Sequence, residues 1–161
     1  MNLQLYIKMK KLKKVIIVRH GDYERTTKEL TSAGITQTRN LVERINRKIN
    51  DLGKIQLFTS NIRRSIHTGK VIASSLEVSD KKQLFELEWD KYYSREKLYP
   101  IVAKRIEDDT ETVIIVTHFE MPSGLADMFM KEGFGTSVEP SISANAGGFL
   151  CCMQSGEFRK I

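Results

Sequence analysis

The sequence predicts an α/β fold in which a largely parallel central sheet lies between two helical layers, a three-layer α/β/α sandwich. The first observation is a pair of β-branched runs, at residues 15–18 and 113–116, that no polar residue interrupts. Such runs are typical of strands buried on both faces of a helix-covered sheet. The second is the alternation of short apolar runs with helical segments, which is typical of parallel sheets with right-handed crossovers.

The first half of the chain predicts two pairs of a strand and a helix. Residues that favour helix N-caps start both helices, and a glycine at position 53 follows the end of the first helix. In order, the predicted elements are a strand at 15–18, a helix capped by Thr31 or Ser32 that runs to Ile49, a strand at 55–59, and a helix capped by Ser60 or Asn61 that reaches about Leu76.

The second half continues the same alternation after a segment of less regular pattern. Within residues 81–93, Phe85, Leu87 and Trp89 alternate with polar residues, which predicts a strand or an extended loop beside the site. The remaining predicted elements are a helix at 95–107, a strand at 113–116, a helix at 123–131, and a strand at 149–153 that ends the sheet.

Length and composition fit one folded unit. The chain has 161 residues, of which 40% are hydrophobic and 29% charged, values that exclude the disordered and collagen-like classes. We expect a basic leader over residues 1–13 and a single domain over residues 14–161. The net charge of +6 arises in part from five clustered lysines: Lys8, Lys10, Lys11, Lys13 and Lys14. No aromatic platform or recognition motif accompanies them, which favours a solvated leader over a specific nucleic-acid or membrane surface.

The cysteines and the apolar runs indicate a compartment. Cys151 and Cys152 are adjacent, which suits neither a disulfide framework nor a zinc site with spaced ligands. No run approaches the roughly 18 apolar residues of a membrane-spanning helix, and the run at 15–18 is too short for a signal-peptide core. These features predict a cytoplasmic protein with no membrane span, and they leave the oligomeric state open.

A short repeated sequence is the most specific indication of a functional site. The sequence Val-Ile-Ile-Val occurs at 15–18 and again at 113–116, and a histidine follows each run two positions later, His20 and His118. If both runs are parallel strands, both imidazoles lie at the carboxyl edge of the sheet with the same side-chain parity. Open α/β sheets bind ligands in the crevice at that edge. One such histidine could simply end a strand, but the duplication predicts a site.

The neighbours of the first histidine indicate a phosphate ligand. Arg19 offers a permanent cation with a planar fork of donors, and Gly21 lets the backbone approach a ligand closely. A dianionic phosphate ester repels an anionic nucleophile, whereas a neutral imidazole can attack phosphorus when cations hold its oxygens. His20 is therefore the candidate nucleophile. A metal between His20, His118 and a carboxylate is disfavoured, because the sequence shows no clustered Asp and further His ligands.

The triplet Arg19-His20-Gly21 after a hydrophobic strand resembles the signature of the histidine phosphatase superfamily, also called phosphoglycerate mutase-like. Three further stretches resemble family segments in the same order: Leu30 to Gln37, Ser60 to Thr68, and Val116 to His118. The likeness covers most of the chain, about residues 14–152. The set is far more specific than the triplet alone.

The resemblance implies a phosphoglycerate mutase-like fold and a role for each matching residue. His20 becomes a phosphohistidine, and Arg19, Gly21, Arg64 and His118 surround the transferred group. The charge on that group is then held by the protein's own cations, so that neither a metal nor another cofactor is expected. Water hydrolyses the intermediate in a second step.

Two arginines compete for the second phosphate-binding position. The alignment favours Arg64, because it lies one helical turn past Ser60, but Arg63 is close enough to be a rival. Ser60 is expected to support the site by capping the helix and orienting Arg64. His67 stands where the family has a glutamine, and a surface or helix-packing role is expected for it.

The sequence offers four candidates for the general acid. The family acid often follows a Leu-x-Glu pattern, which residues 84–86 match, so Glu86 is preferred. Glu88 points to the same side of an extended segment and is the next candidate. Asp22 and Glu120 are further candidates. Glu120 also belongs to a departure from the family pattern, because a bulky pair replaces the glycine that often follows the second histidine.

The compact length resembles the short SixA-type protein phosphohistidine phosphatases, so the expected partner is a phosphoprotein or a phosphorylated small molecule. Phosphohistidine has a better leaving group than phosphoserine, and an enzyme acting on it can manage with a weak acid. Two alternatives stay open. One is a general small-molecule phosphomonoesterase, for which Glu86 would matter greatly, and the other is a weakly catalytic adaptor that binds a phosphorylated ligand.

Overall fold

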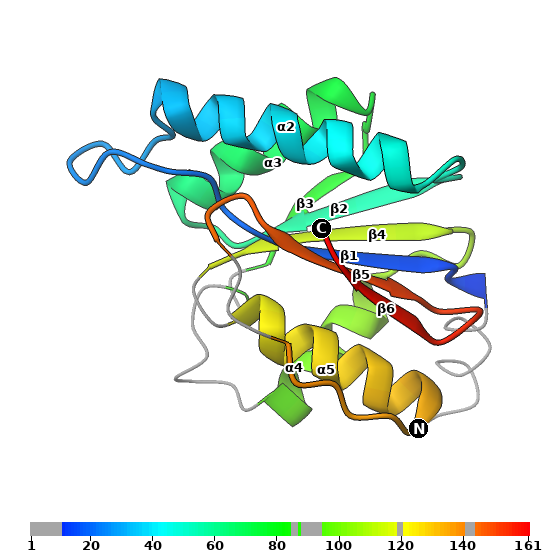
Figure 1. Ribbon diagram of the computed structural model, residues 1–161. Coiled ribbons are helices and arrows are strands. Elements are labelled where there is room, and N and C mark those ends of the chain that lie inside the picture. Colours follow the sequence, from blue (N-terminus) through cyan, green and yellow to red (C-terminus); the bar gives the residue numbers. More distant parts are fainter. Residues whose placement is uncertain (1–10, 85–86, 88–94, 119–120, 141–143) are drawn as a thin grey trace.

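The computed structural model describes residues 11–84, 87, 95–118, 121–140 and 144–161. Within these residues the strands form one six-stranded sheet in the order β3-β2-β4-β1-β5-β6 (Figure 1). In chain order the strands are β1 (Lys14–Arg19), β2 (Ile55–Thr59), β3 (Lys81–Gln83), β4 (Thr112–Thr117), β5 (Gly148–Cys152) and β6 (Glu157–Lys160).

The sheet is parallel on one side of β1 and antiparallel on the other. The pairs β2 with β3, β2 with β4, and β1 with β4 are parallel, whereas β5 is antiparallel to both β1 and β6. The central pair brings the echoed sequences together residue for residue, with Val15 opposite Val113 and Val18 opposite Val116. The carboxyl ends of β1, β2 and β4 therefore share one edge of the sheet.

Helices cover both faces of the sheet (Figure 1). One layer consists of α2 (Ser32–Lys48) and α3 (Arg63–Ser75), and the other of α4 (Arg95–Arg105) and α5 (Met121–Phe134). The β-branched runs explain the two cores, because successive side chains alternate between the faces. Ile16 and Val18 pack toward α2 and α3, while Val15 and Ile17 pack toward α4 and α5. The predicted α/β sandwich with a largely parallel sheet is confirmed.

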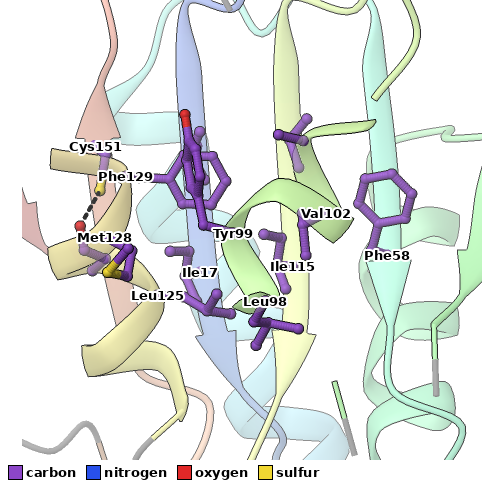
Figure 2. Close-up of a cluster of buried hydrophobic side chains, with 14 of the residues drawn as sticks. Ile17, Phe58, Leu98, Tyr99, Val102, Ile115, Leu125, Met128, Phe129 and Cys151 are labelled. Carbon is purple, nitrogen blue, oxygen red and sulfur yellow. Dashed lines mark hydrogen bonds between the residues drawn. The ribbon is translucent and has the colours of Figure 1, made fainter. Parts of the chain in front are cut away.

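Figure 2 shows the core on the α4 and α5 face, where aliphatic and aromatic side chains of the two helices meet those of the central strands. Tyr99 of α4 and Phe129 of α5 make an edge-to-face contact with their ring centroids 5.1 Å apart. Burial raises the pKa of the Tyr99 phenol to about 12. This residue therefore stays neutral and joins the two helices at any physiological pH.

Two predictions about element ends are wrong. The strand near residue 150 does not end the sheet, because β6 (Glu157–Lys160) follows it through a turn with Gly156 at φ +75°. Phe158 is the one residue of β6 that favours a strand in the sequence. In the structure its ring stacks on the ring of Phe149, with the centroids 5.4 Å apart. Ser60 and Asn61 do not cap a helix either, because α3 begins at Arg63 with Ile62 as the N-cap residue and no side-chain cap.

The predicted boundaries of the other helices agree with the structure to within a few residues. Thr31 is the N-cap of α2, and its side chain accepts a hydrogen bond from the backbone of Gly34. Helix α5 begins at Met121, two residues before the predicted start. The residues Phe85 and Trp89 of the irregular segment lie outside the described residues, as do residues 1–10 of the predicted leader. No helix in the described part of the chain is long and apolar enough to cross a bilayer.

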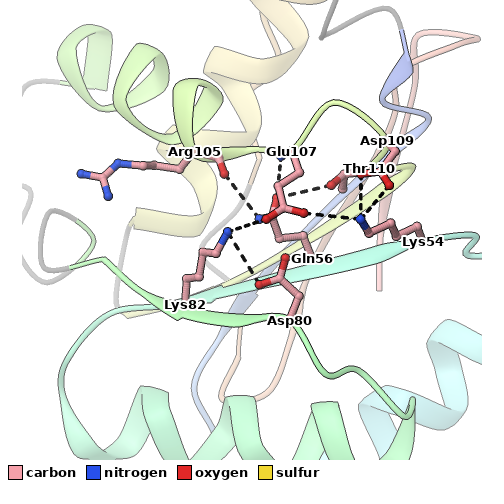
Figure 3. A network of polar contacts seen from close by, with 8 residues as sticks. All are labelled: Lys54, Gln56, Asp80, Lys82, Arg105, Glu107, Asp109 and Thr110. Atoms are coloured by element: carbon pink, nitrogen blue, oxygen red, sulfur yellow. Dashed lines mark hydrogen bonds and ion pairs between the residues drawn. The ribbon is translucent and has the colours of Figure 1, made fainter.

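A polar network ties the C-terminus of α4 to the sheet (Figure 3). The buried Gln56 of β2 donates to the carbonyl of Arg105 at 3.4 Å, and its Oε1 accepts from the backbone of Glu107 at 3.0 Å. The carboxylate of Glu107 lies between the ammonium groups of Lys54 and Lys82, at 3.4 and 2.8 Å. The network lies at the amino end of the parallel strands, opposite the histidines.

We expect Gln56→Leu to lower the free energy of unfolding by about 2 kcal/mol, because it removes both hydrogen bonds between the buried Gln56 amide and the backbone of Arg105 and Glu107. The measurement is urea denaturation at equilibrium. Lys54→Gln is the matched control, because it removes only exposed ion pairs, which contribute little. Equal losses in the two variants would contradict the role given to Gln56.

Candidate active site

The structure brings the two echoed histidines together at the carboxyl edge of the sheet. The backbone N–H of His20 donates to the carbonyl of Thr117 at 3.0 Å, which continues the pairing of β1 with β4 by one residue. The ring centroids of His20 and His118 lie 6.5 Å apart, with 77° between the ring planes. The parallel register thus places the two imidazoles near each other at the same edge of the sheet.

The hydrogen bonds of His20 determine its tautomer. Its Nδ1 lies 2.8 Å from the carbonyl oxygen of Gly21, and its Nε2 lies 2.9 Å from Nε of Arg64. A carbonyl oxygen can only accept, so Nδ1 carries the proton, and a guanidinium can only donate, so Nε2 presents its lone pair. The ring is therefore a neutral imidazole whose Nε2 lone pair accepts the hydrogen bond from the guanidinium.

The environment of His20 keeps the ring neutral. The side chain is 3% exposed. Its pKa is lowered from 6.5 to about 4, first by burial and then by the positive charges of Arg64 and Arg19 and by His118, while the hydrogen bond to Gly21 opposes the shift. A neutral imidazole beside two guanidiniums combines a nucleophile with a cationic pocket, which suits group transfer from an anionic substrate.

The lowered pKa of His20 predicts a measurable pH dependence. Between pH 4 and pH 6.5 the unfolded chain binds this proton and the folded chain does not, so the contribution to stability is complete above pH 6.5 and is lost as the pH falls toward 4. The shift corresponds to roughly 3 kcal/mol. We expect the His20 ring signals in an NMR titration to move near pH 4. A midpoint near 6.5 would contradict the burial argument.

The turn that carries His20 is held between two helices. The backbone N–H of Gly21 donates to Oγ1 of Thr68 at 3.1 Å, and that hydroxyl donates to the carbonyl of Arg64 at 2.8 Å. On the other side, a Cβ at Gly21 would lie 2.6 Å from the carbonyl oxygen of Gly34 at the start of α2. The turn therefore fits only with glycine at this position, for reasons of packing as well as access.

The two rival arginines have different surroundings. Arg64 is half-buried, and its Nε contacts His20. Arg63 is exposed, and its Nη1 reaches the backbone carbonyl of Thr27 at 3.5 Å. Of the two guanidiniums, that of Arg64 therefore lies at the histidine pair.

Ser60 contributes to the site through its backbone. Its N–H donates to the carbonyl of Val116 at 3.1 Å, which extends the pairing of β2 with β4 past Thr59. Its buried Oγ has no hydrogen-bond partner among the described residues. The expectation that this side chain caps the helix is wrong, because α3 begins at Arg63 with Ile62 as its N-cap residue and no side-chain cap. Its role in orienting Arg64 stays a prediction.

The candidate acids differ in what the structure says of them. Asp22 is half-buried next to the turn, and its Oδ1 accepts from Nδ2 of Asn145 at 3.3 Å. Glu86, Glu88 and Glu120 lie outside the described residues. Among the described residues, no group of three or more His, Cys, Asp or Glu side chains is arranged to hold a metal ion.

Tyr23 and His67 make contacts at the site that were not predicted from the sequence. The aromatic ring of Tyr23 lies 5.2 Å from the ring of His20 and 4.6 Å from Cζ of Arg64. His67, for which packing was expected, accepts from the backbone N–H of Leu30 at 3.2 Å and joins α3 to the segment after the turn. The position of Tyr23, two residues past the glycine of the turn, was the one available signal for its role.

Comparison with known sequences identifies a protein family that matches this chain. The sequence pattern of the histidine phosphatase superfamily (branch 1) matches residues 15–111, a stretch that includes His20 and Arg64 and ends before His118. No curated protein is similar enough in sequence to count as a match.

Solved structures are similar in fold. The protein histidine phosphatase SixA complexed with tungstate has a TM-score of 0.68 at 16% identity, with 92% of this chain and 94% of that chain covered. A SixA protein of Agrobacterium tumefaciens has a TM-score of 0.64 at 16% identity, covering 92% and 95%. A mycobacterial glucosyl-3-phosphoglycerate phosphatase complexed with VO3 has a TM-score of 0.58 at 16% identity, covering 86% and 92%.

Proposed function

The chain belongs to the histidine phosphatase superfamily, and on that premise we propose that it hydrolyses a phosphorylated substrate through a phosphohistidine at Nε2 of His20. Membership and the phosphatases of similar fold support phosphatase activity. The observation that carries the finer proposal is the neutral tautomer of His20, whose lone pair faces the Arg64 guanidinium. A buried, neutral imidazole within hydrogen-bond distance of a guanidinium lies next to the place where that cation would hold an anionic substrate.

The first step transfers the phosphoryl group. The lone pair of His20 Nε2 forms a bond to phosphorus while the bond from phosphorus to the leaving atom breaks, and the leaving group departs with that electron pair and takes up a proton. Arg19 and Arg64 carry positive charge near His20, as their effect on its pKa indicates. We assign them, with His118, to the phosphoryl oxygens. The backbone at Gly21, expected from the sequence to contact the phosphate, instead donates its N–H to Thr68 and accepts from His20. The protein's own cations thus fill the role for which other phosphatases use metal.

The second step returns the enzyme to its resting state. Water attacks phosphorus on the side that the leaving group vacated, the bond to Nε2 breaks, and inorganic phosphate is released. The hydrogen bond from Nδ1 to the carbonyl of Gly21 holds the ring in one orientation through both steps. One residue protonates the leaving group and later accepts the proton of the attacking water. We assign this role of general acid and base to Glu86, and Asp22 is the alternative.

The substrate class that we favour is a protein phosphohistidine, because the fold is more similar to SixA, with a TM-score of 0.68, than to glucosyl-3-phosphoglycerate phosphatase, with 0.58. The alternative is a small phosphate ester, which the similar fold of glucosyl-3-phosphoglycerate phosphatase supports. Activity of wild type and Glu86→Gln on both substrate types separates the two. If Glu86→Gln still hydrolyses phosphohistidine, a protein phosphohistidine is favoured as the substrate. If the substitution slows both reactions equally and wild type hydrolyses the ester faster, a small phosphate ester is favoured.

The experiment that tests the mechanism combines turnover with trapping. Wild-type protein should hydrolyse an aryl phosphate at the same rate with and without a chelator, and quenching during turnover should trap an acid-labile, base-stable label. Turnover that the chelator abolishes, or label that survives in His20→Asn, would reject the mechanism. Binding of phosphate without turnover would instead favour an adaptor.

We also keep the cytoplasm as the expected location, since Cys151 and Cys152 are free thiols.

A further inference from the structure

The guanidinium of Arg64 is held by two groups at once. Its Nε donates to Nε2 of His20 at 2.9 Å, and its Cζ lies 4.6 Å from the centroid of the Tyr23 ring. The ring of Tyr23 also meets the ring of His20 edge-on, at 5.2 Å and 83°. Nucleophile, arginine and tyrosine therefore form a closed triangle of contacts.

The contact between Arg64 and His20 conflicts with catalysis as it stands. A neutral imidazole has one lone pair on Nε2, and in this structure the Arg64 N–H occupies it. Attack on phosphorus requires the same lone pair. The guanidinium must therefore leave Nε2 when a phosphate arrives, and the phosphoryl oxygens, which are stronger acceptors for a guanidinium, are the groups that draw it away.

The hairpin that contains Tyr23 and Leu30 is hydrogen-bonded to α3, the helix that contains Arg64. Tyr23 and Leu30 form an antiparallel bridge, and the backbone of Leu30 donates to Nδ1 of His67. Arg64 and His67 are three residues apart on α3, so they project from neighbouring positions on one helix face. These backbone contacts fix the position of the Tyr23 ring relative to α3, and they do not involve the Arg64 guanidinium.

We propose that Tyr23 is a positioning residue, whose aromatic face carries the Arg64 guanidinium from its hydrogen bond with His20 to the phosphoryl oxygens of the substrate. The inference rests on the proposed function. A cation stacked on a ring keeps its favourable contact while it shifts in the plane of the ring, whereas a hydrogen bond to a fixed partner would oppose the shift. Tyr23 therefore keeps Arg64 near the site in both positions and reduces the freedom that the arginine loses on binding.

The test is a double-mutant cycle on tungstate binding, measured by calorimetry with the full chain. We expect Tyr23→Leu to weaken tungstate binding about tenfold, and Tyr23→Phe, which keeps the ring, to stay within about twofold of wild type. In the Arg64→Gln background, Tyr23→Leu should change binding by less than about twofold, because the cation that lies over the ring is gone. The kcat/KM for an aryl phosphate should follow the same pattern.

Each outcome bears on a different claim. A tenfold loss from Tyr23→Leu in both backgrounds, or an equal loss from Tyr23→Phe, would overturn the role of Tyr23 while leaving the phosphatase proposal intact. Tungstate binding that shows the expected coupling in a protein without turnover would support Tyr23 and reject the phosphatase. No tungstate binding by wild type would reject both. Circular dichroism and the urea midpoint of Tyr23→Leu show whether a loss of binding reflects unfolding, and Tyr23→Phe supplies the test if it does.

Discussion

Replacing His20 by asparagine is expected to lower kcat/KM for an aryl phosphate by at least about 10³-fold, because the amide offers no lone pair that can attack phosphorus. The fold should survive, since the asparagine side chain is smaller and can still donate to the carbonyl of Gly21. Steady-state kinetics and the loss of trapped label measure the effect. Tungstate binding should persist, because Arg64 and the other cations remain.

His67 provides the matched control for this substitution. His67→Gln keeps an acceptor for the backbone N–H of Leu30, so we expect kcat/KM within about threefold of wild type. Loss of activity in both variants would point to a general effect of removing an imidazole. Retention of activity in His20→Asn would remove the nucleophile from the mechanism and favour direct attack by water.

The sheet and the histidine pair could be predicted because their signals are local and repeated. The runs Val15 to Val18 and Val113 to Val116 are apolar on both faces, a composition that fits only a strand covered by helices on both sides. Once both are strands, equal spacing decides that His20 and His118 leave the sheet at the same edge. The convergence follows from counting residues and requires no knowledge of the loops.

The parts that could not be predicted depend on contacts between distant segments. Strand β6 has three polar residues of four, and its pairing with β5 is what makes it a strand. Ser60 is a residue type that favours helix N-caps, but its N–H donates to the carbonyl of Val116 in the neighbouring strand, and the helix begins only at Arg63. The role of Tyr23 depends on a hairpin that places its ring on α3. In each case tertiary pairing overrides a local preference.

The second large effect is expected for Gly21→Ala, because the added methyl group has no space. Its Cβ would lie 2.6 Å from the carbonyl oxygen of Gly34 and 3.0 Å from Oγ1 of Thr38, so either the turn or the start of α2 must shift. The shift moves the carbonyl that orients His20 and the N–H that binds Thr68. We expect kcat/KM to fall about 100-fold or more, since a displacement near 1 Å is sufficient for that loss.

A loss of stability accompanies this change and must be separated from the loss of geometry. Overpacking at Gly21 should cost about 1–3 kcal/mol of unfolding free energy. Gly135 is the matched control: it has φ +66° with no atom within 4 Å of an added Cβ, so Gly135→Ala strains the backbone far from the site. We expect that variant to lose about 1 kcal/mol of stability and to keep its activity. If Gly21→Ala lost stability but kept kcat/KM, the turn would not need its present geometry, and the orientation of His20 would have to come from Arg64 and Tyr23 alone.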